Sequence, residues 1–206
     1  MAYRTVPHLN LTQLEEEIYI LTHTELRGYP KGHPRARQRE GLTGYAFDFF
    51  LNDLLQQHRN AIVLDECIKE RKTKTTIKKA VLRRRIVKRT TPRFLILPVD
   101  VEGHFFSYVL DKDNNIVYRV DCGDPSQSGI SDRAIKRALG GGWSDVQLMP
   151  KSTRNGWYCG DCGPFVLYYI NKIIRGERLD RLTQKKTQEF RIGMGNYLEG
   201  TVNRWI

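Results

Sequence analysis

The sequence predicts one domain of the α+β class, and three observations lead to this prediction. Apolar side chains recur at helical spacing between Leu42 and His58, within a first part of the chain that is mainly helical. Compact apolar segments between Phe94 and Asp121 flank a polar turn, which is typical of an antiparallel hairpin. An apolar helix is predicted from Phe165 onward, just after a cysteine. Early helices, a central hairpin and a later helix together describe an α+β domain.

The same patterns predict the remaining elements. Amphipathic segments indicate further helices near both ends of the chain, and a triple glycine ends a short helix between them. The apolar run at 62–67 is of uncertain type. We expect one domain over 1–206, divided into a helical part (1–60), a basic segment (69–93) and a core (94–206). The predicted helices cover 11–26, 42–58, part of 69–93, 132–139, 165–175 and 184–198, and the predicted strands cover 94–99, 104–110, 116–121 and 146–149.

Composition narrows the class of protein. The chain has 206 residues, of which 40% are apolar, as in ordinary globular domains. It contains no run of about 20 apolar residues, so we expect no membrane-spanning helix, and its first residues lack the apolar stretch of a secretory signal. Its 4 cysteines are too few to staple the fold. We therefore expect reduced thiols in a reducing compartment, either host cytoplasm or nucleus, or packaging inside a virion.

Positive charge is concentrated in the basic segment. Residues 69–93 contain twelve Lys or Arg and one acid, Glu70, so this segment alone accounts for the net charge of +11. Such a block indicates a site for a polyanion such as DNA or RNA, or for an acidic protein surface. The candidate polyanion-binding residues are Lys78, Lys79, Arg83, Arg84, Arg85, Lys88 and Arg89.

Cys162 is the candidate nucleophile. It lies in the sequence Gly-Asp-Cys-Gly-Pro immediately before the predicted apolar helix, and Pro164 suits the first turn of that helix. A thiol at a helix N-terminus meets the positive end of the helix dipole, which stabilises the thiolate. The flanking glycines leave the sulfur accessible to an extended peptide.

His104 and Asp121 are the candidate partners of this thiolate. Among the 5 histidines, only His104 begins a predicted strand of the central sheet. A hairpin turn centred between Lys112 and Asp113 places His104 opposite Asp121 on the next strand. An aspartate beside an imidazole fixes its tautomer and stabilises the imidazolium. The sequence thus predicts a Cys-His-Asp triad.

Several segments together resemble one enzyme family. The resemblance lies in order and spacing, and each piece alone is weak. It extends from Leu42-Thr43-Gly44 through Gly103-His104-Phe105, Val120-Asp121-Cys122, Asn155-Gly156 and Asp161-Cys162-Gly163 to Phe190-Arg191. In this order the chain resembles the papain-like cysteine proteases of the branch that holds the SUMO and ubiquitin-like-protein proteases and the adenovirus-type maturation protease (adenain). The resemblance implies a mostly antiparallel central sheet flanked by helices, with the nucleophile at a helix N-terminus.

The resemblance also implies roles for further residues. Phe105 stands where the family has a Trp that covers the Gly-Gly tail of the substrate. We expect the Phe105 ring to cover this tail in the same way. The family's oxyanion-hole Gln is missing just before the cysteine; Asn155, or more distantly Gln147, offers a side-chain amide, and the Cys162 backbone N–H supplies another donor. The candidate substrate-cleft residues are Phe105, Gly156, Trp157, Gly160 and Asp161.

Alternatives remain open at the cysteines. Two residues are inserted before Asp161, so that Cys159 also fits the family's Asn-Gly-x-x-Cys-Gly pattern. Cys159 and Cys162 form a C-x-x-C pair at a helix start, which is typical of thioredoxin-like redox proteins. A zinc site would need Cys67 and Cys122 to join them. A protease fold without activity would remain a basic binding module.

The function we predict is that of a cysteine endopeptidase cleaving after Gly-Gly-type sites. We favour viral precursor or capsid maturation with nucleic-acid association, and the alternative is a protease that removes SUMO or another ubiquitin-like protein, from a cell or a bacterial effector. We expect a monomer with a Gly-rich protein substrate, no membrane partner, no metal and no cofactor, although nucleic acid or a peptide could serve as an activator.

Overall fold

The computed structural model describes residues 42, 44–63, 68–69, 92–101, 104–122, 142–144, 147–148 and 161–202. The helices predicted at 11–26 and 132–139, and nearly all of the basic segment, lie outside these residues. Each helix and strand predicted inside them is present. None of the described helices is long and apolar enough to cross a lipid bilayer.

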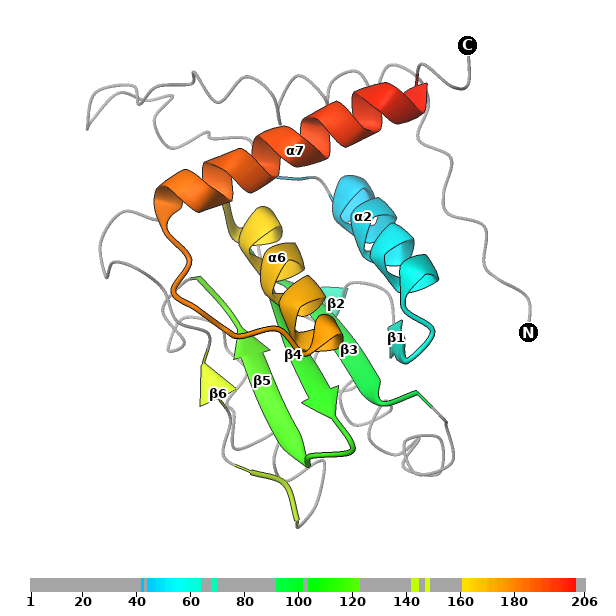
Figure 1. Ribbon diagram of the computed structural model, residues 1–206, viewed down its shortest axis with the longest axis vertical. Coiled ribbons are helices and arrows are strands. Elements are labelled where there is room, and N and C mark those ends of the chain that lie inside the picture. The colour runs from blue at the N-terminus through cyan, green and yellow to red at the C-terminus, as the bar shows by residue number, and fades with distance from the viewer. Residues whose placement is uncertain are drawn as a thin grey trace.

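The described strands form one mixed sheet (Figure 1). Its centre is antiparallel, as predicted, because β3 pairs with β4 and β4 pairs with β5 through a tight turn. The short outer strands run parallel to their neighbours: β1 and β2 both pair with β3, and β6 pairs with β5. The bounds are β1 Ala61–Val63, β2 Ile68–Lys69, β3 Phe94–Val101, β4 His104–Asp111, β5 Ile116–Val120 and β6 Gln147–Leu148.

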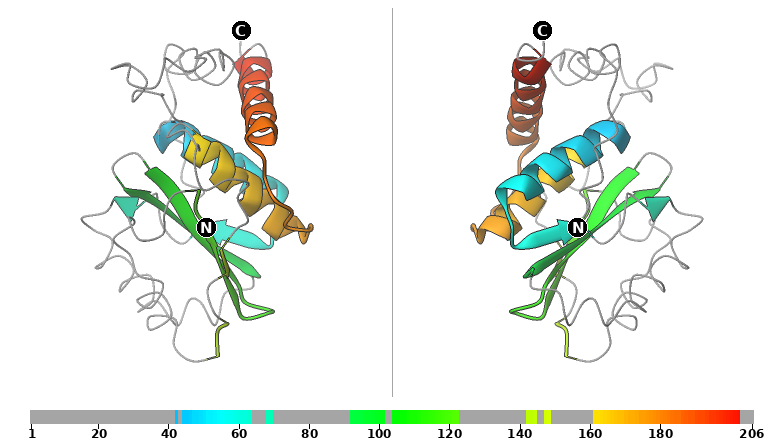
Figure 2. Two further views of the ribbon diagram at one scale, coloured as in Figure 1. Left: turned by 90° about the vertical axis from the view of Figure 1, so that its left-hand side faces the viewer. Right: turned by 90° about the vertical axis from the view of Figure 1, so that its right-hand side faces the viewer.

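Three described helices gather on one face of this sheet (Figure 2). They are α2 (Gly44–Gln57), α6 (Cys162–Arg175) and α7 (Gln184–Val202). Both α2 and α6 lie against the sheet, and α7 lies farther out. Helix α6 begins three residues earlier than predicted, at the cysteine itself, and it ends at Gly176, whose φ of 67° gives the left-handed cap that glycine favours.

The core fills the space between the sheet and the helices. Alternation along β4 directs Phe105 and Val109 into this core, together with Val120 of β5. Apolar side chains of α6 belong to the same core cluster, among them Phe165, Val166 and Ile170. The next residues along β4, Phe106 and Tyr108, are also buried but face the other side of the sheet. The sheet therefore buries both of its faces, and His104 shares the second face with Phe106.

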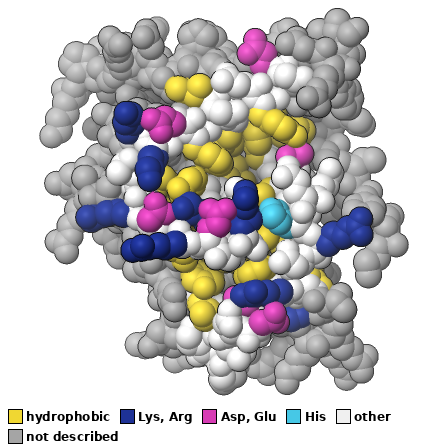
Figure 3. Space-filling view, in the orientation of Figure 1, with side chains coloured by type: hydrophobic (Ala, Val, Ile, Leu, Met, Phe, Trp, Pro, Cys, Tyr) yellow, Lys and Arg dark blue, Asp and Glu magenta, His cyan; other side chains and the backbone are white. Residues whose placement is uncertain are grey.

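The segment after α6 is held by ion pairs and by one tyrosine. Lys172 binds Asp180, which also lies 3.5 Å from Lys186. Figure 3 shows basic and acidic side chains side by side on the face that bears these helices. Beneath them, the Tyr169 hydroxyl donates to the Asp180 carbonyl and accepts from the Leu182 N–H, at 2.8 and 3.0 Å. These bonds fix the path of the chain from α6 to α7.

Candidate active site

Cys162 is the first residue of α6 and lies at the edge of the core. Its side chain is buried, and the thiol is reduced. The backbone N–H of Phe105 donates to the Cys162 sulfur at 3.4 Å. Since Phe105 follows His104 directly, this bond fixes the helix terminus beside the start of β4. A thiol in this position receives the positive end of the α6 dipole, as the sequence predicted.

A glycine allows α6 to approach the N-terminal part of the domain closely. A Cβ atom on Gly163 would lie 2.9 Å from Leu42 Cδ1 and 3.2 Å from Leu42 Cβ. Any larger residue would therefore push Leu42 or the first turn of α6 aside. The glycine after the cysteine thus has a packing role, in addition to any role in leaving the sulfur accessible.

His104 and Asp121 are hydrogen-bonded, with 2.8 Å between Nε2 and Oδ1. The predicted register was wrong, however. Val120 pairs with Ser107, so Asp121 follows on beside Phe106 rather than directly opposite His104. The turn spans residues 112–115, and its centre lies one residue later than predicted. A shift of this size leaves both side chains on the same face, as diagonal neighbours.

The surroundings of His104 favour its protonated form. Hydrogen bonds to Asp121 and then to Cys162 raise the pKa of His104 from 6.5 to about 10, although partial burial opposes them. Because Nε2 binds Asp121, Nδ1 is the ring nitrogen that can serve the thiol. An imidazolium beside a thiol at a helix N-terminus is the arrangement that stabilises a thiolate.

Arg119 completes the surroundings of Asp121, and the sequence analysis did not identify it. Its Nε and Nη2 donate to Asp121 Oδ2 at 3.3 and 2.8 Å. Its guanidinium carbon lies 5.3 Å from the centre of the Phe106 ring and 5.9 Å from that of Tyr108. Both members of the pair are almost completely buried, with 2% and 1% of their side chains exposed. The i, i+2 spacing of Arg119 and Asp121 was the signal that could have identified it.

Two predicted cleft residues are buried instead. Phe105 is 3% exposed, and its ring stacks on Phe47 with 4.8 Å between the centroids. Strand alternation explains the difference, because neighbours along β4 must face opposite sides, so Phe105 turns away from His104 into the core. Asp161 is 2% exposed and accepts a hydrogen bond from Arg191 Nη1 at 3.1 Å. It ties the start of α6 to α7 and does not line an open cleft.

The other predicted site residues lie on β6 or outside the described residues. Gln147 lies on β6, where its backbone position pairs with Tyr118. The described residues hold no cluster of three or more His, Cys, Asp or Glu side chains that could hold a metal ion. Asn155, Gly156, Trp157, Cys159 and Gly160, and the polyanion-binding candidates Lys78, Lys79, Arg83, Arg84, Arg85, Lys88 and Arg89, lie outside the described residues.

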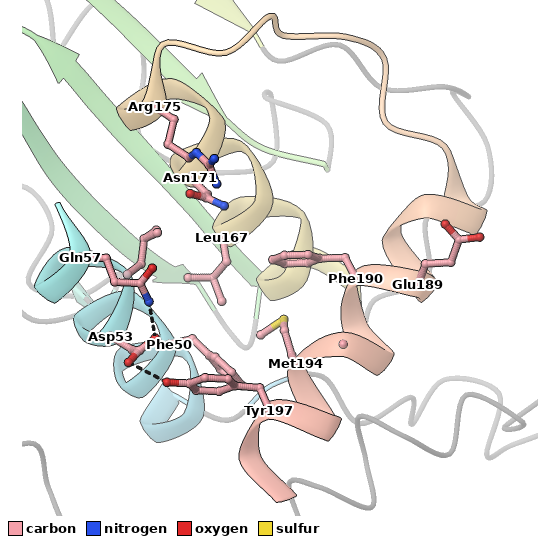
Figure 4. A pocket seen from close by; sticks show the side chains of 12 residues that line it. Phe50, Asp53, Gln57, Leu167, Asn171, Arg175, Glu189, Phe190, Met194 and Tyr197 are labelled. Carbon is pink, nitrogen blue, oxygen red and sulfur yellow. Dashed lines mark hydrogen bonds between the residues drawn. The ribbon is translucent and has the colours of Figure 1, made fainter. Parts of the chain in front are cut away.

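A groove between the helices is separate from this site. It encloses about 440 Å³ between α2, α6 and α7 (Figure 4). Leu167, Phe190 and Met194 give it an apolar floor, and Asp53 at its edge accepts a hydrogen bond from the Tyr197 hydroxyl at 2.9 Å. The α6 residues that line it begin more than one turn after the cysteine, so it is not part of the candidate active site.

Comparison with solved structures identifies the fold. The chain is similar to the C-terminal Ulp1 protease domain in complex with Smt3, the yeast ortholog of SUMO, with a TM-score of 0.60, 17% identity and coverage of 95% of this chain and 97% of that one. The chain has the fold of Ulp1-type proteases. It is also similar to SUMO protease Ulp1 with its catalytic cysteine oxidised to a sulfenic acid, with a TM-score of 0.58, 15% identity and coverage of 96% and 98%.

A further solved structure agrees. The Chaetomium thermophilum Ulp1-like SUMO protease catalytic domain gives a TM-score of 0.51 at 14% identity, over 96% of this chain and 92% of that one. No protein-family model matches the sequence, and no curated protein matches it either. The papain-like α+β fold expected from the family resemblance is confirmed, and it contradicts the thioredoxin-like alternative.

Proposed function

We propose that this protein is a cysteine protease in which Cys162 is the nucleophile, His104 is the general base and acid, and Asp121 orients His104. The observation that carries the proposal is the convergence of these three side chains from β4, the end of β5 and the start of α6. His104 is hydrogen-bonded to Asp121, and the neighbouring backbone N–H contacts the Cys162 sulfur. These are the partners that a thiolate nucleophile requires.

The geometry supports a two-step mechanism. The Cys162 thiolate attacks the substrate carbonyl carbon, and protonated His104 gives its proton to the leaving amine as the C–N bond breaks. Neutral His104 then takes a proton from water, which attacks the acyl-enzyme and releases the second product. Asp121 holds the imidazole in place throughout. The Cys162 backbone N–H, with the amide of Asn155 or of Gln147, would stabilise the oxyanion.

We favour a ubiquitin-like protein as the substrate, released after a Gly-Gly-type terminus. The fold likeness extends over nearly the whole of this chain and of the yeast Ulp1 domain, and that domain is in complex with Smt3. This supports the deconjugating alternative of the sequence analysis better than virion maturation. Binding of nucleic acid by the basic segment stays a prediction, and twelve cationic side chains suit an acidic protein surface equally well.

The test uses SUMO and ubiquitin that carry a fluorogenic amine on the C-terminal glycine. We expect hydrolysis of at least one substrate by the wild type, and no measurable hydrolysis by Cys162→Ala or His104→Ala. The matched control is Cys122→Ala, because Cys122 is also a buried, reduced thiol, one residue after Asp121. It should retain most activity.

A second measurement does not depend on the substrate. Brief iodoacetamide treatment near pH 6, followed by mass spectrometry, should alkylate Cys162 selectively in the wild type and more slowly in His104→Ala. Labelling of Cys159 instead would move the nucleophile by three residues. An unreactive Cys162, with no hydrolysis of either protein, would refute the proposal.

A further inference from the structure

We propose that Arg119 is a positioning residue of the active site: it locks the Asp121 carboxylate toward His104 and supplies the positive charge that balances the buried catalytic groups. The inference rests on the proposed roles of Cys162, His104 and Asp121.

The hydrogen bonds of Asp121 fix the orientation of its carboxylate. One carboxylate oxygen, Oδ1, accepts from His104 Nε2, and the other, Oδ2, accepts from Arg119 Nε and Nη2. The carboxylate cannot rotate without breaking bonds at both oxygens. Arg119 and Asp121 are two residues apart on one chain segment, so β5 itself sets their separation. Arg119 thus fixes the direction from which Asp121 meets the imidazole.

The aromatic residues of β4 hold the guanidinium in place. Arg119 is cation–π stacked with Phe106 and Tyr108, whose rings lie next to each other, 6.0 Å apart and nearly perpendicular. His104 belongs to the same row, with its ring 6.2 Å from that of Phe106. Burying a guanidinium is unfavourable unless it is paired. The rings and Asp121 meet this requirement, and they leave Arg119 little freedom to move.

The net charge of the catalytic groups indicates the second role of Arg119. In the reactive state Cys162 and Asp121 are anions and His104 is a cation, so the triad alone has a net charge of −1. Arg119 brings this buried group to neutrality. Without Arg119, the excess negative charge would favour binding of a proton. The Cys162 thiolate, which is the nucleophile of the proposed reaction, is a group that would take up this proton. Loss of Arg119 should therefore move thiolate formation to higher pH.

No other described group at this site supplies the same charge. On the face occupied by Arg119, β3 contributes the apolar residues Leu97 and Val99. Tyr108 is the remaining titratable side chain of β4 on that face. On α6 and α7, Asp161 and Arg191 form an ion pair with each other, so they contribute little net charge. Among the described residues, Arg119 is thus the cation that offsets the triad.

The experiment is the rate of Cys162 alkylation by iodoacetamide from pH 4 to pH 10, in the full chain. Arg119→Met removes both the charge and the donors, and Arg119→Lys keeps the charge but loses the two-donor geometry. We expect the pH of half-maximal rate to rise by about one unit or more in Arg119→Met, with alkylation about tenfold slower on the acid side. In Arg119→Lys we expect it to stay close to the wild-type value.

The chain offers a matched control at the other end of the hairpin. Arg93 donates to both oxygens of Asp111 at 2.9 and 2.8 Å, and its guanidinium lies 4.7 Å from the centre of the Phe94 ring. Arg93→Met therefore removes a similar pair far from Cys162. It should leave the alkylation curve unchanged. If Arg119→Met does not fold, Arg119→Gln replaces it, because Gln also lacks the charge.

The outcomes separate the inference from the proposed function. A curve that shifts in Arg119→Met but not in Arg119→Lys or Arg93→Met supports the inference. An unshifted curve in Arg119→Met, with Cys162 still activated by His104, overturns the inference and leaves the protease proposal intact. A shift of equal size in Arg93→Met also overturns it, since the effect would then follow general loss of stability. A wild-type Cys162 that reacts no faster than in His104→Ala removes the proposed function itself.

Discussion

An arginine–aspartate pair lies at each end of the β4–β5 hairpin. The two pairs differ in the other hydrogen-bond donors that the aspartate carboxylate binds. At the turn end, Asp111 binds Arg93 and also accepts from the Asp113 and Asn114 backbone N–H groups and from the Asn114 side chain. These donors belong to the turn or, in the case of Arg93, to the residue just before β3. The pair at this end therefore closes a hairpin.

At the other end, the aspartate serves an imidazole. Asp121 divides its oxygens between Arg119 and His104, and His104 is close to Cys162. Exposure differs as well: the Arg93 side chain is 37% exposed, whereas that of Arg119 is 2% exposed. If the proposed function holds, the same two residue types stabilise the fold where water reaches them, and set the electrostatics of a reaction where it does not.

Truncation of the two aspartates tests this contrast most strongly. Asp121→Ala should lower kcat/KM by roughly 10³-fold, because the imidazole loses the group that orients it and stabilises its charge. Asp111→Ala should retain near-wild-type kcat/KM. Hydrolysis of a ubiquitin-like fluorogenic substrate measures both, and circular dichroism checks that both variants are folded. Near-wild-type activity in Asp121→Ala would remove Asp121 from the mechanism.

At the turn end, the main effect of removing the aspartate should be on stability. Asp111 is 2% exposed and accepts bonds from several donors, so Asp111→Ala should lower the free energy of unfolding by about 1–3 kcal/mol. Urea denaturation measures the change. A loss well below 1 kcal/mol would mean that the turn forms without Asp111 and that the proposed division between the two ends is wrong.

Sequence reasoning could predict this hairpin but not its details. Compact apolar segments identified both strands, and the polar residues 111–115 identified the turn. The register depends on how many residues the turn takes up, which differs between turn types. Here Asn115 adopts a positive φ of 54° in a turn of four residues. The side-chain period of two kept His104 and Asp121 on one face despite the wrong register.

The missed and misassigned residues have different physical causes. An arginine inside a strand is normally solvent-exposed, and only the tertiary contacts of Arg119 show that it is buried. Phe105 was assigned to the substrate cleft by its resemblance to a family Trp, although its position beside His104 on a strand already predicted that it faces the other way. The burial of Asp161 depends on Arg191, thirty residues later on another helix. Such long-range pairings leave no local pattern.

The two ends should also lose stability at opposite ends of the pH scale. Hydrogen bonding to Asp121 raises the pKa of His104 to about 10, so its contribution is complete below pH 6.5 and is lost as the pH rises through about 10. Burial alone would raise the pKa of Asp111, but hydrogen bonds from Arg93 and Asn114 lower it below 3.8. Its contribution is present above pH 3.8 and is lost as the pH falls.

Urea denaturation at a series of pH values tests these signs. The difference in unfolding free energy between wild type and His104→Gln should shrink between pH 7 and pH 10, and that between wild type and Asp111→Asn should shrink below pH 4. A difference for His104→Gln that grows toward pH 10 would show that the imidazole is neutral in the folded protein, contrary to the ion pair with Asp121.

The smallest expected effect belongs to Arg93. Its side chain is more than one third exposed, so water screens its attraction to Asp111, and Arg93→Met should cost only about 0.5–1 kcal/mol of unfolding free energy. Activity should not change at any pH. Thermal unfolding and the pH–rate profile should be measured for Arg93→Met and Arg119→Met together, so that the two arginines are compared directly. If burial decides the role of each pair, Arg119→Met must move the pH–rate profile and Arg93→Met must leave it in place. Equal profiles in the two variants would mean that the position of an arginine along this hairpin has no bearing on the chemistry at Cys162.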